Sequence, residues 1–179
     1  IGAFAYSGQV CIHTQRIFVC DQHFDAFVDR FTKSTTSLRC GDPADPETEI
    51  STMIDEANAT RVENWIREAI DEGAKLLCGG GRDGSYVEPT VLTNTDTGIK
   101  VSGEEVFGPV VIIERYQDFD EAVEMVNDSP FGLQAGVFTN DLRKINHAHQ
   151  SLEVGGVIIN DVPTFRVDHM PYGGIKESG

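Results

Sequence analysis

The strongest structural pattern lies in residues 110–160, which read VVIIERYQDFDEAVEMVNDSPFGLQAGVFTNDLRKINHAHQSLEVGGVIIN. Short apolar runs alternate there with segments whose apolar residues recur at helical spacing. We expect strands at 110–116, 135–139 and 155–160, and helices at 120–128 and 141–152. The last run is continuously apolar, which predicts a strand buried on both faces. Repeated strand–helix–strand crossovers predict an α/β fold, with a mostly parallel sheet and helices on both faces.

The segments before residue 110 fit the same architecture. We expect a strand at 15–20, strands at 75–78 and 88–93, and a loop at 40–49. The helix after the first strand has one apolar stripe, formed by Phe24, Phe27, Val28 and Phe31. A long amphipathic helix is predicted at 51–72, with these residues facing the core: Ile54, Val62, Ile66, Ala69 and Ile70.

Residues 79–84 read GGGRDG and match the GxGxxG pattern of dinucleotide-binding loops. Such a loop needs a helix directly after it, because the helix N-terminus holds the pyrophosphate. A strand-like segment with Pro89 follows instead. We therefore interpret these glycines as a turn and reject them as a phosphate site.

Composition excludes several classes of protein. The chain has 179 residues, of which 40% are apolar and 24% charged, so it is globular and long enough for one domain. Its 14 basic and 29 acidic residues give a net charge of −15, which argues against nucleic acid and anionic membranes as partners. No apolar run approaches the ~20 residues of a membrane span. The four cysteines lack the spacing of metal ligands, so we expect reduced thiols and no metal site.

Two segments carry candidate chemistry. Cys11 follows a glycine in SGQVCI (residues 7–12), and from the residues alone a small buried hydrophobe and an activated nucleophile are equally good interpretations. His13 is close in sequence, but proximity does not imply a Cys–His dyad, and structural roles are favoured for all five histidines. Residues 104–110, EEVFGPV, form either a turn capped by a buried Phe or an acceptor and aromatic face at a strand mouth.

Five segments, in register along nearly the whole chain, together resemble the aldehyde dehydrogenase superfamily. They are GQVC with Arg16, YVEPTVL (86–92), EEVFGPV (104–110), FGL with AGVF (131–138), and Asn160 with MPYGGIKESG (170–179). Residues 49–54 depart from the family, because many relatives have Gly-Pro before Met53. We expect that departure to lie away from the site. The segment around Cys11 and the loop 161–166 are most similar to succinate-semialdehyde and lactaldehyde dehydrogenases.

The resemblance implies a role for each matching residue. Cys11 would be the nucleophile that attacks an aldehyde to give a thiohemiacetal and then a thioester, and its backbone N–H would serve the oxyanion hole. Glu105 would bind the ribose hydroxyls of NAD or NADP, and Phe107 would pack beside that ribose and the nicotinamide. Phe165 and Arg166 would lie at the substrate entrance, where Arg166 either pairs with an anionic substrate tail or is a rim residue without a ligand.

The resemblance also implies an organisation. Residues 1–179 would be the nucleophile-bearing catalytic domain of a longer, cytoplasmic, homo-oligomeric enzyme. A coenzyme-binding domain and a C-terminal strand would lie outside this chain, so the cofactor would be bound mainly elsewhere and the chain alone would be inactive. Two alternatives stay open. One is a CoA-acylating aldehyde dehydrogenase, and the other is a non-catalytic structural or binding relative.

Overall fold

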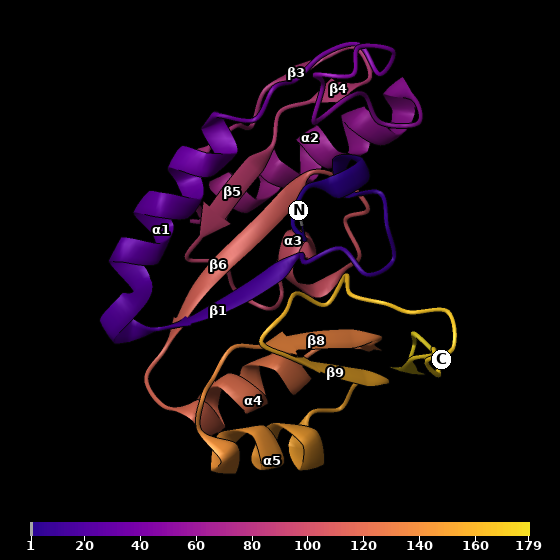
Figure 1. Cartoon of the computed structure of the whole chain (residues 1–179). Coiled ribbons are helices and arrows are strands. Elements are labelled where there is room, and N and C mark those ends of the chain that lie inside the picture. Colours follow the sequence, from indigo (N-terminus) through magenta and orange to yellow (C-terminus); the bar gives the residue numbers. More distant parts are fainter. Residues whose placement is uncertain (1) are drawn as a thin grey trace. The chain divides into compact units, whose positions relative to one another are not determined.

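The computed structural model describes residues 2–179 (Figure 1). Their contacts divide them into two compact units, and each is described by itself. The first comprises Ala3–Arg115. The second comprises Tyr116–Gly179, with Gly2 assigned to it.

The first unit is built on a four-stranded sheet with the order β1-β6-β5-β2. These strands are β1 (Arg16–Cys20), β6 (Val110–Tyr116), β5 (Thr90–Thr93) and β2 (Lys75–Cys78). β5 and β6 pair in parallel, with Val91 opposite Val111, and Figure 1 shows β1 running in the same direction. β2 pairs antiparallel with β5 at the edge. The sheet is therefore parallel-rich, as the crossovers predicted.

Alternating residues of the two central strands pack against helices on opposite faces. Leu92, Val110 and Ile112 share one core cluster with buried residues of α2 (Glu56–Asp71). Val91, Val111 and Ile113 share a second cluster with α1 (Asp21–Thr36), whose Phe24 is buried and whose Phe27, Val28 and Phe31 are partly buried. Because successive side chains of a strand point to opposite faces, this division places one helix on each face of the sheet.

The helix predicted at 51–72 begins later than expected. Asp55 is its N-cap and accepts a hydrogen bond from the Asn58 backbone N–H at 2.7 Å. Val62, Ile66 and Ala69 are buried as predicted, but Ile54 lies before the helix and is 80% exposed, and Ile70 is 38% exposed. The prediction was wrong for both residues. Ile54 is outside the helix because residues 51–54 bond to other segments instead of continuing the helical ladder, whereas Ile70 lies in the last turn of α2 and is only partly covered.

The glycines at 79–84 form a turn, as the sequence predicted. Gly79 and Gly80 both have positive φ, and the chain continues into a short hairpin of β3 (Arg82–Asp83) and β4 (Tyr86–Val87). No helix follows them before β5. Two short helical elements were not predicted, a 3-10 helix η1 (Ala5–Gly8) and α3 (Lys100–Gly103), and neither were the two strands of this hairpin.

The second unit contains a βαβ crossover. β8 (Gln134–Val137) and β9 (Gly156–Ile159) pair in parallel and are joined by α5 (Leu142–Ser151), whose N-cap is Asp141 as expected. α4 (Phe119–Asn127) contacts α5. β7 (Phe131–Gly132) pairs antiparallel with β10 (Ile175–Lys176).

The last strand of this crossover is less buried than its sequence predicted. All four residues of β9 are half-buried rather than fully buried. Within the described chain β9 pairs with β8 and no further strand, which leaves part of its apolar surface uncovered. The expectation of burial on both faces was therefore wrong for this chain.

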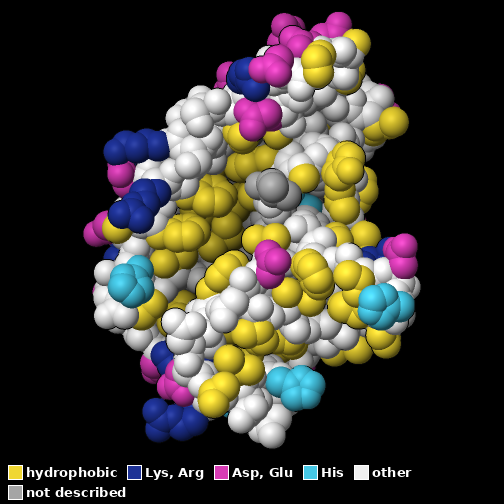
Figure 2. Space-filling view, in the orientation of Figure 1, with side chains coloured by type: hydrophobic (Ala, Val, Ile, Leu, Met, Phe, Trp, Pro, Cys, Tyr) yellow, Lys and Arg dark blue, Asp and Glu magenta, His cyan; other side chains and the backbone are white. Residues whose placement is uncertain are grey.

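Acidic side chains gather at one end of the first unit, over the β3–β4 hairpin and the neighbouring loop (Figure 2). Asp42, Asp45, Glu47 and Glu49 of that loop are all exposed, which fits a solvated surface. Among residues 2–179, no helix is long and apolar enough to cross a membrane. The same residues contain no cluster of three or more His, Cys, Asp or Glu side chains able to hold a metal ion.

Candidate active site

Cys11 lies on an exposed turn between η1 and β1. The backbone before it is unusual, because Tyr6 and Ser7 have φ of 53° and 56° and Gly8 has φ of 69°. Non-glycine residues rarely adopt this left-handed conformation. The sequence left two interpretations of Cys11 open, a small buried hydrophobe and an activated nucleophile. Its exposure contradicts the first. We call residues 7–12 the nucleophile loop, after the role that the resemblance implies for Cys11.

The segment before β6, residues 104–109, is a second, partly exposed loop, which we call the cofactor loop after the role that the resemblance implies for Glu105 and Phe107. Glu105 is exposed and the Phe107 ring is 40% exposed, while Val106 between them is fully buried. Phe107 has φ of 47°, again left-handed. The alternating burial presents a carboxylate and an aromatic ring on the surface while the intervening valine anchors the turn.

The two loops are in close backbone contact. A Cβ added at Gly8 would overlap the carbonyl oxygen of Gly108, so only glycine fits at that point. Gly108 in turn packs against Val62 of α2. Residues 100 positions apart in sequence are thereby brought side by side.

Gln15, which follows the nucleophile loop, adds hydrogen bonds to the cofactor loop and to α3. Its Nε2 donates to the carbonyl oxygens of Glu104 at 2.7 Å and Val101 at 3.0 Å. Its Oε1 accepts from the backbone N–H of Val106 at 2.9 Å. Arg61 of α2 donates from Nη2 to the Val106 carbonyl oxygen at 2.8 Å. The centre of the cofactor loop is thus held from both sides.

The nucleophile loop is also bonded to the segment before α2. Ser7 Oγ donates to the Ser51 carbonyl oxygen at 2.8 Å and accepts from the Ser51 N–H at 3.2 Å. Gln9 Oε1 accepts from the Ile54 N–H at 2.9 Å. The segment that departs from the family pattern therefore supports the nucleophile loop directly, and our expectation that it lies away from the site was wrong.

Both loops precede strands, and this sets their position on the sheet. The nucleophile loop leads into β1 and the cofactor loop into β6, two neighbouring strands of the sheet. They therefore meet at the amino ends of these strands. Ligands of open α/β sheets ordinarily bind outside the carboxyl ends. The general rule behind the strand-mouth interpretation does not apply here, and loop-to-loop packing shapes the site instead.

His13 supplies no positive charge beside Cys11. Burial lowers the pKa of its imidazole to about 4, against the opposing effect of a hydrogen bond with the Ala3 backbone. The ring is therefore neutral at pH 7. This fits the structural role that we expected for His13 rather than a charged Cys–His pair.

Phe165 and Arg166 belong to the second unit. Phe165 is 45% exposed, and the Arg166 guanidinium lies over the Tyr172 ring, 4.8 Å from its centroid. Gln134 Nε2 donates to the Pro163 carbonyl oxygen at 2.7 Å and so supports this loop from β8. The structure brings together the segments of Cys11, Glu105 and Phe107, all within the first unit.

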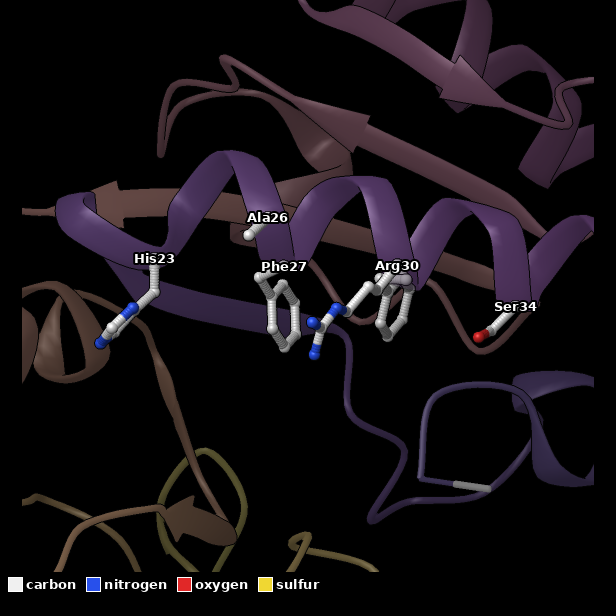
Figure 3. A pocket seen from close by; sticks show the side chains of 6 residues that line it. His23, Ala26, Phe27, Arg30 and Ser34 are labelled. Atoms are coloured by element: carbon white, nitrogen blue, oxygen red, sulfur yellow. The ribbon is translucent and has the colours of Figure 1, made fainter.

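A shallow hollow on the first unit lies along α1 rather than at these loops (Figure 3). Figure 3 shows His23, Phe27 and Arg30 projecting from the same side of the helix. The lining residues all come from α1, and they are His23, Ala26, Phe27, Arg30, Phe31 and Ser34. None of the candidate site residues is among them.

Sequence reasoning missed the side chains that position the two loops, namely Ser7, Gln9, Gln15 and Arg61. Their partners are backbone groups 44 to 91 residues away. Gln15 directly precedes Arg16 of the family motif, which is the only local signal that singled out its neighbourhood.

The whole chain matches a known family. The model of the aldehyde dehydrogenase family matches residues 1–179, and the chain belongs to that family. It is 50% identical over 177 residues to the 3-sulfolactaldehyde dehydrogenase of Priestia aryabhattai, covering 99% of this chain and 37% of that protein. The chain thus spans little more than a third of the length of the curated relatives it matches.

Solved structures agree with the fold. Aldehyde dehydrogenase 21 of Physcomitrella patens, in complex with the reaction product succinate, matches with a TM-score of 0.95 and 44% identity, covering 97% of this chain and 36% of that one. Glyceraldehyde-3-phosphate dehydrogenase of Methanocaldococcus jannaschii, complexed with NADP, matches with a TM-score of 0.95 and 40% identity, covering 99% and 38%. The α/β fold and the family resemblance inferred from the sequence are confirmed.

Proposed function

We propose that this chain is the nucleophile-bearing catalytic domain of an NAD(P)+-dependent aldehyde dehydrogenase that converts an aldehyde to a carboxylic acid. The observation that carries the proposal is the packing of the nucleophile loop against the cofactor loop at Gly8 and Gly108. This contact sets an exposed thiol and an exposed carboxylate–aromatic pair on adjoining segments. Family membership supports the same assignment.

Cys11 is the nucleophile in this proposal. Its thiolate adds to the aldehyde carbon, and the C–S bond that forms gives a thiohemiacetal whose oxygen carries the negative charge. The backbone N–H of Cys11 donates to that oxygen. NAD(P)+, which Glu105 and Phe107 would help to hold, would accept a hydride from this adduct, and a thioester would then remain on Cys11. Water then cleaves the C–S bond, which releases the acid and returns the thiol, a good leaving group for this step.

Glu105 and Phe107 are proposed to hold the cofactor, which accepts the hydride when bound. The exposed residues of the cofactor loop fit such a group chemically. A carboxylate accepts hydrogen bonds from both vicinal hydroxyls of a ribose, and an exposed ring offers an apolar face to the sugar and nicotinamide. The remaining cofactor contacts are proposed to lie outside residues 1–179.

We propose a small aldehyde with an anionic tail as the substrate. Three similar proteins carry names or ligands with such groups, a sulfonate, a carboxylate and a phosphate. Phe165 and Arg166 are proposed to line the substrate entrance, where the guanidinium pairs with the anion. Arg166→Ala should raise KM for anionic aldehydes about tenfold or more and leave KM for neutral ones unchanged. Equal KM values in variant and wild type would remove this assignment.

The deciding experiment uses the full-length protein that contains this chain. NAD+ and NADP+ reduction is followed over a panel of small aldehydes, for wild type, Cys11→Ala and Cys40→Ala. Cys40 is an exposed thiol of the same unit and serves as the matched control. We expect activity to vanish in Cys11→Ala and to persist in Cys40→Ala. Activity that survives in Cys11→Ala would show that the cysteine and the mechanism are wrong.

The same assay separates the alternatives. Activity that requires added CoA would identify a CoA-acylating enzyme. Folded wild-type protein without activity with either cofactor would favour a non-catalytic relative. For the 179-residue chain alone we expect no NAD(P)H formation, because most of the cofactor site is proposed to lie outside it. Turnover by that chain would contradict the proposed organisation.

A further inference from the structure

The side-chain amide of Gln15 makes three hydrogen bonds to the segments that flank the candidate site. An amide has two N–H donors and one acceptor oxygen. Both kinds of group are engaged here, with contacts of 2.7, 3.0 and 2.9 Å to backbone atoms of Glu104, Val101 and Val106. These partners lie 86 to 91 residues away, so the bonds fix tertiary structure rather than a local turn.

The peptide group that Gln15 holds is the centre of the cofactor loop. The Val106 N–H is bound by Gln15, its carbonyl oxygen is bound by Arg61, and its side chain is fully buried. Glu105 and Phe107, immediately before and after, are exposed. The two peptide groups on either side of the Val106 Cα are thereby fixed, which sets the direction in which the neighbouring side chains leave the surface.

The conformation that is held in this way is a costly one. Phe107 has φ of 47°, in the left-handed region, where a residue with a Cβ is strained. Such a conformation persists only when its surroundings over-determine it. Bonds from Gln15 and Arg61, together with the close backbone contact at Gly8 and Gly108, provide those surroundings.

We propose that Gln15 is a positioning residue that holds the cofactor loop in the conformation in which Glu105 and Phe107 bind NAD(P)+. This inference rests on the proposed function, because it requires the cofactor to bind at that loop. Gln15 sits four residues after Cys11, at the entry to β1.

The test measures cofactor binding directly, by calorimetric titration of the full-length protein with NAD+ and NADP+. Gln15→Met keeps the length of the side chain and removes its hydrogen bonds. We expect Kd to rise about tenfold, the effect of losing hydrogen bonds that hold a strained loop. Gln22→Met, the same change at an exposed site on α1, should leave Kd unchanged.

Three further measurements distinguish a positioning role of Gln15 from a general structural role. KM for the cofactor should rise in Gln15→Met, while KM for the aldehyde and the alkylation rate of Cys11 stay at the wild-type values. Gln15→Asn, one methylene shorter, should give an intermediate Kd, and it replaces the methionine variant if that protein does not fold. A Kd within twofold of wild type in the folded variants overturns the inference, as do parallel rises in both KM values.

The same measurements distinguish failure of the proposed function from failure of the inference about Gln15. Wild-type protein that binds the cofactor but oxidises no aldehyde would defeat the proposed function, while the Kd comparison would still decide the role of Gln15. Wild-type protein that binds neither NAD+ nor NADP+ overturns the inference together with the cofactor assignment.

Discussion

At the residue scale, the candidate site depends on a few positions where the backbone conformation restricts which residue type is tolerated. Gly8 combines a φ of 69° with a close backbone approach to Gly108 of the other loop. The polar side chains around it bond to backbone atoms rather than to each other. Such bonds constrain the path of the backbone around the exposed Cys11 and Glu105.

Gly8→Ala should therefore be much more harmful than an alanine at another glycine of positive φ. We expect it to lower the free energy of unfolding by roughly 3 kcal/mol or more, since strain and a clash with the Gly108 carbonyl combine. Gly84 has φ of 57°, and a Cβ there meets nothing within 4 Å. Gly84→Ala should cost only about 1 kcal/mol of conformational strain. Urea denaturation of both variants measures this difference, and equal losses would contradict it.

At the scale of the element, the apolar pattern of a segment does not by itself decide which of its residues are buried. The hydrogen-bond partners of the segment matter as much. α2 is amphipathic, and its inward face at Val62, Ile66 and Ala69 packs on the sheet. Residues 51–54 carry a compatible apolar pattern, yet they bond to Ser7, Gln9 and Ser85, which lie outside α2. Asp55 then caps the helix and fixes its first residue.

Two isoleucine variants distinguish these environments. Ile66 is 1% exposed within the core, so Ile66→Ala should cost about 3 kcal/mol through lost burial and a cavity. Ile54, which the sequence had placed on the inward face, should lose less than about 0.5 kcal/mol in Ile54→Ala. Thermal and chemical unfolding of the two proteins would measure the contrast. A large loss for Ile54→Ala would mean that the residue is buried.

At the scale of the whole molecule, the two units differ in how much apolar surface they bury. Among the described residues, both large core clusters lie in Ala3–Arg115. The buried hydrophobic residues of Tyr116–Gly179 are three small ones, Ala122, Val123 and Ala148. Because burial is the main source of stability, the second unit has the smaller stabilising core.

Hydrogen exchange of the 179-residue chain should reveal this asymmetry. Amides of β5 and β6, which lie between two core clusters, should exchange slowest. Amides of β8 and β9 should exchange at least about tenfold faster, because fewer buried contacts oppose local opening. Peptide-resolved mass spectrometry makes the comparison, and equal protection of the two strand pairs would contradict it.

Patterns that depend on neighbours a few positions apart were readable from the amino acids alone. They include the alternation of strands and helices in residues 110–160, the turn at 79–84, the cap at Asp141 and the motifs that identify the family. Strand periodicity, glycine conformation and capping depend on neighbouring residues, so they can be predicted without knowledge of the fold.

Only the folded chain determined the rest. The start of α2, the half-burial of β9 and the contact of residues 51–54 with the nucleophile loop all depend on partners distant in sequence. So do the three bonds of Gln15, whose acceptors and donor are backbone groups that carry no sequence signal. Every residue except proline offers the same backbone N–H and carbonyl groups, so the identity of the partner residue does not reveal such a hydrogen bond. Burial depends on which surfaces meet. Both were therefore fixed by tertiary packing.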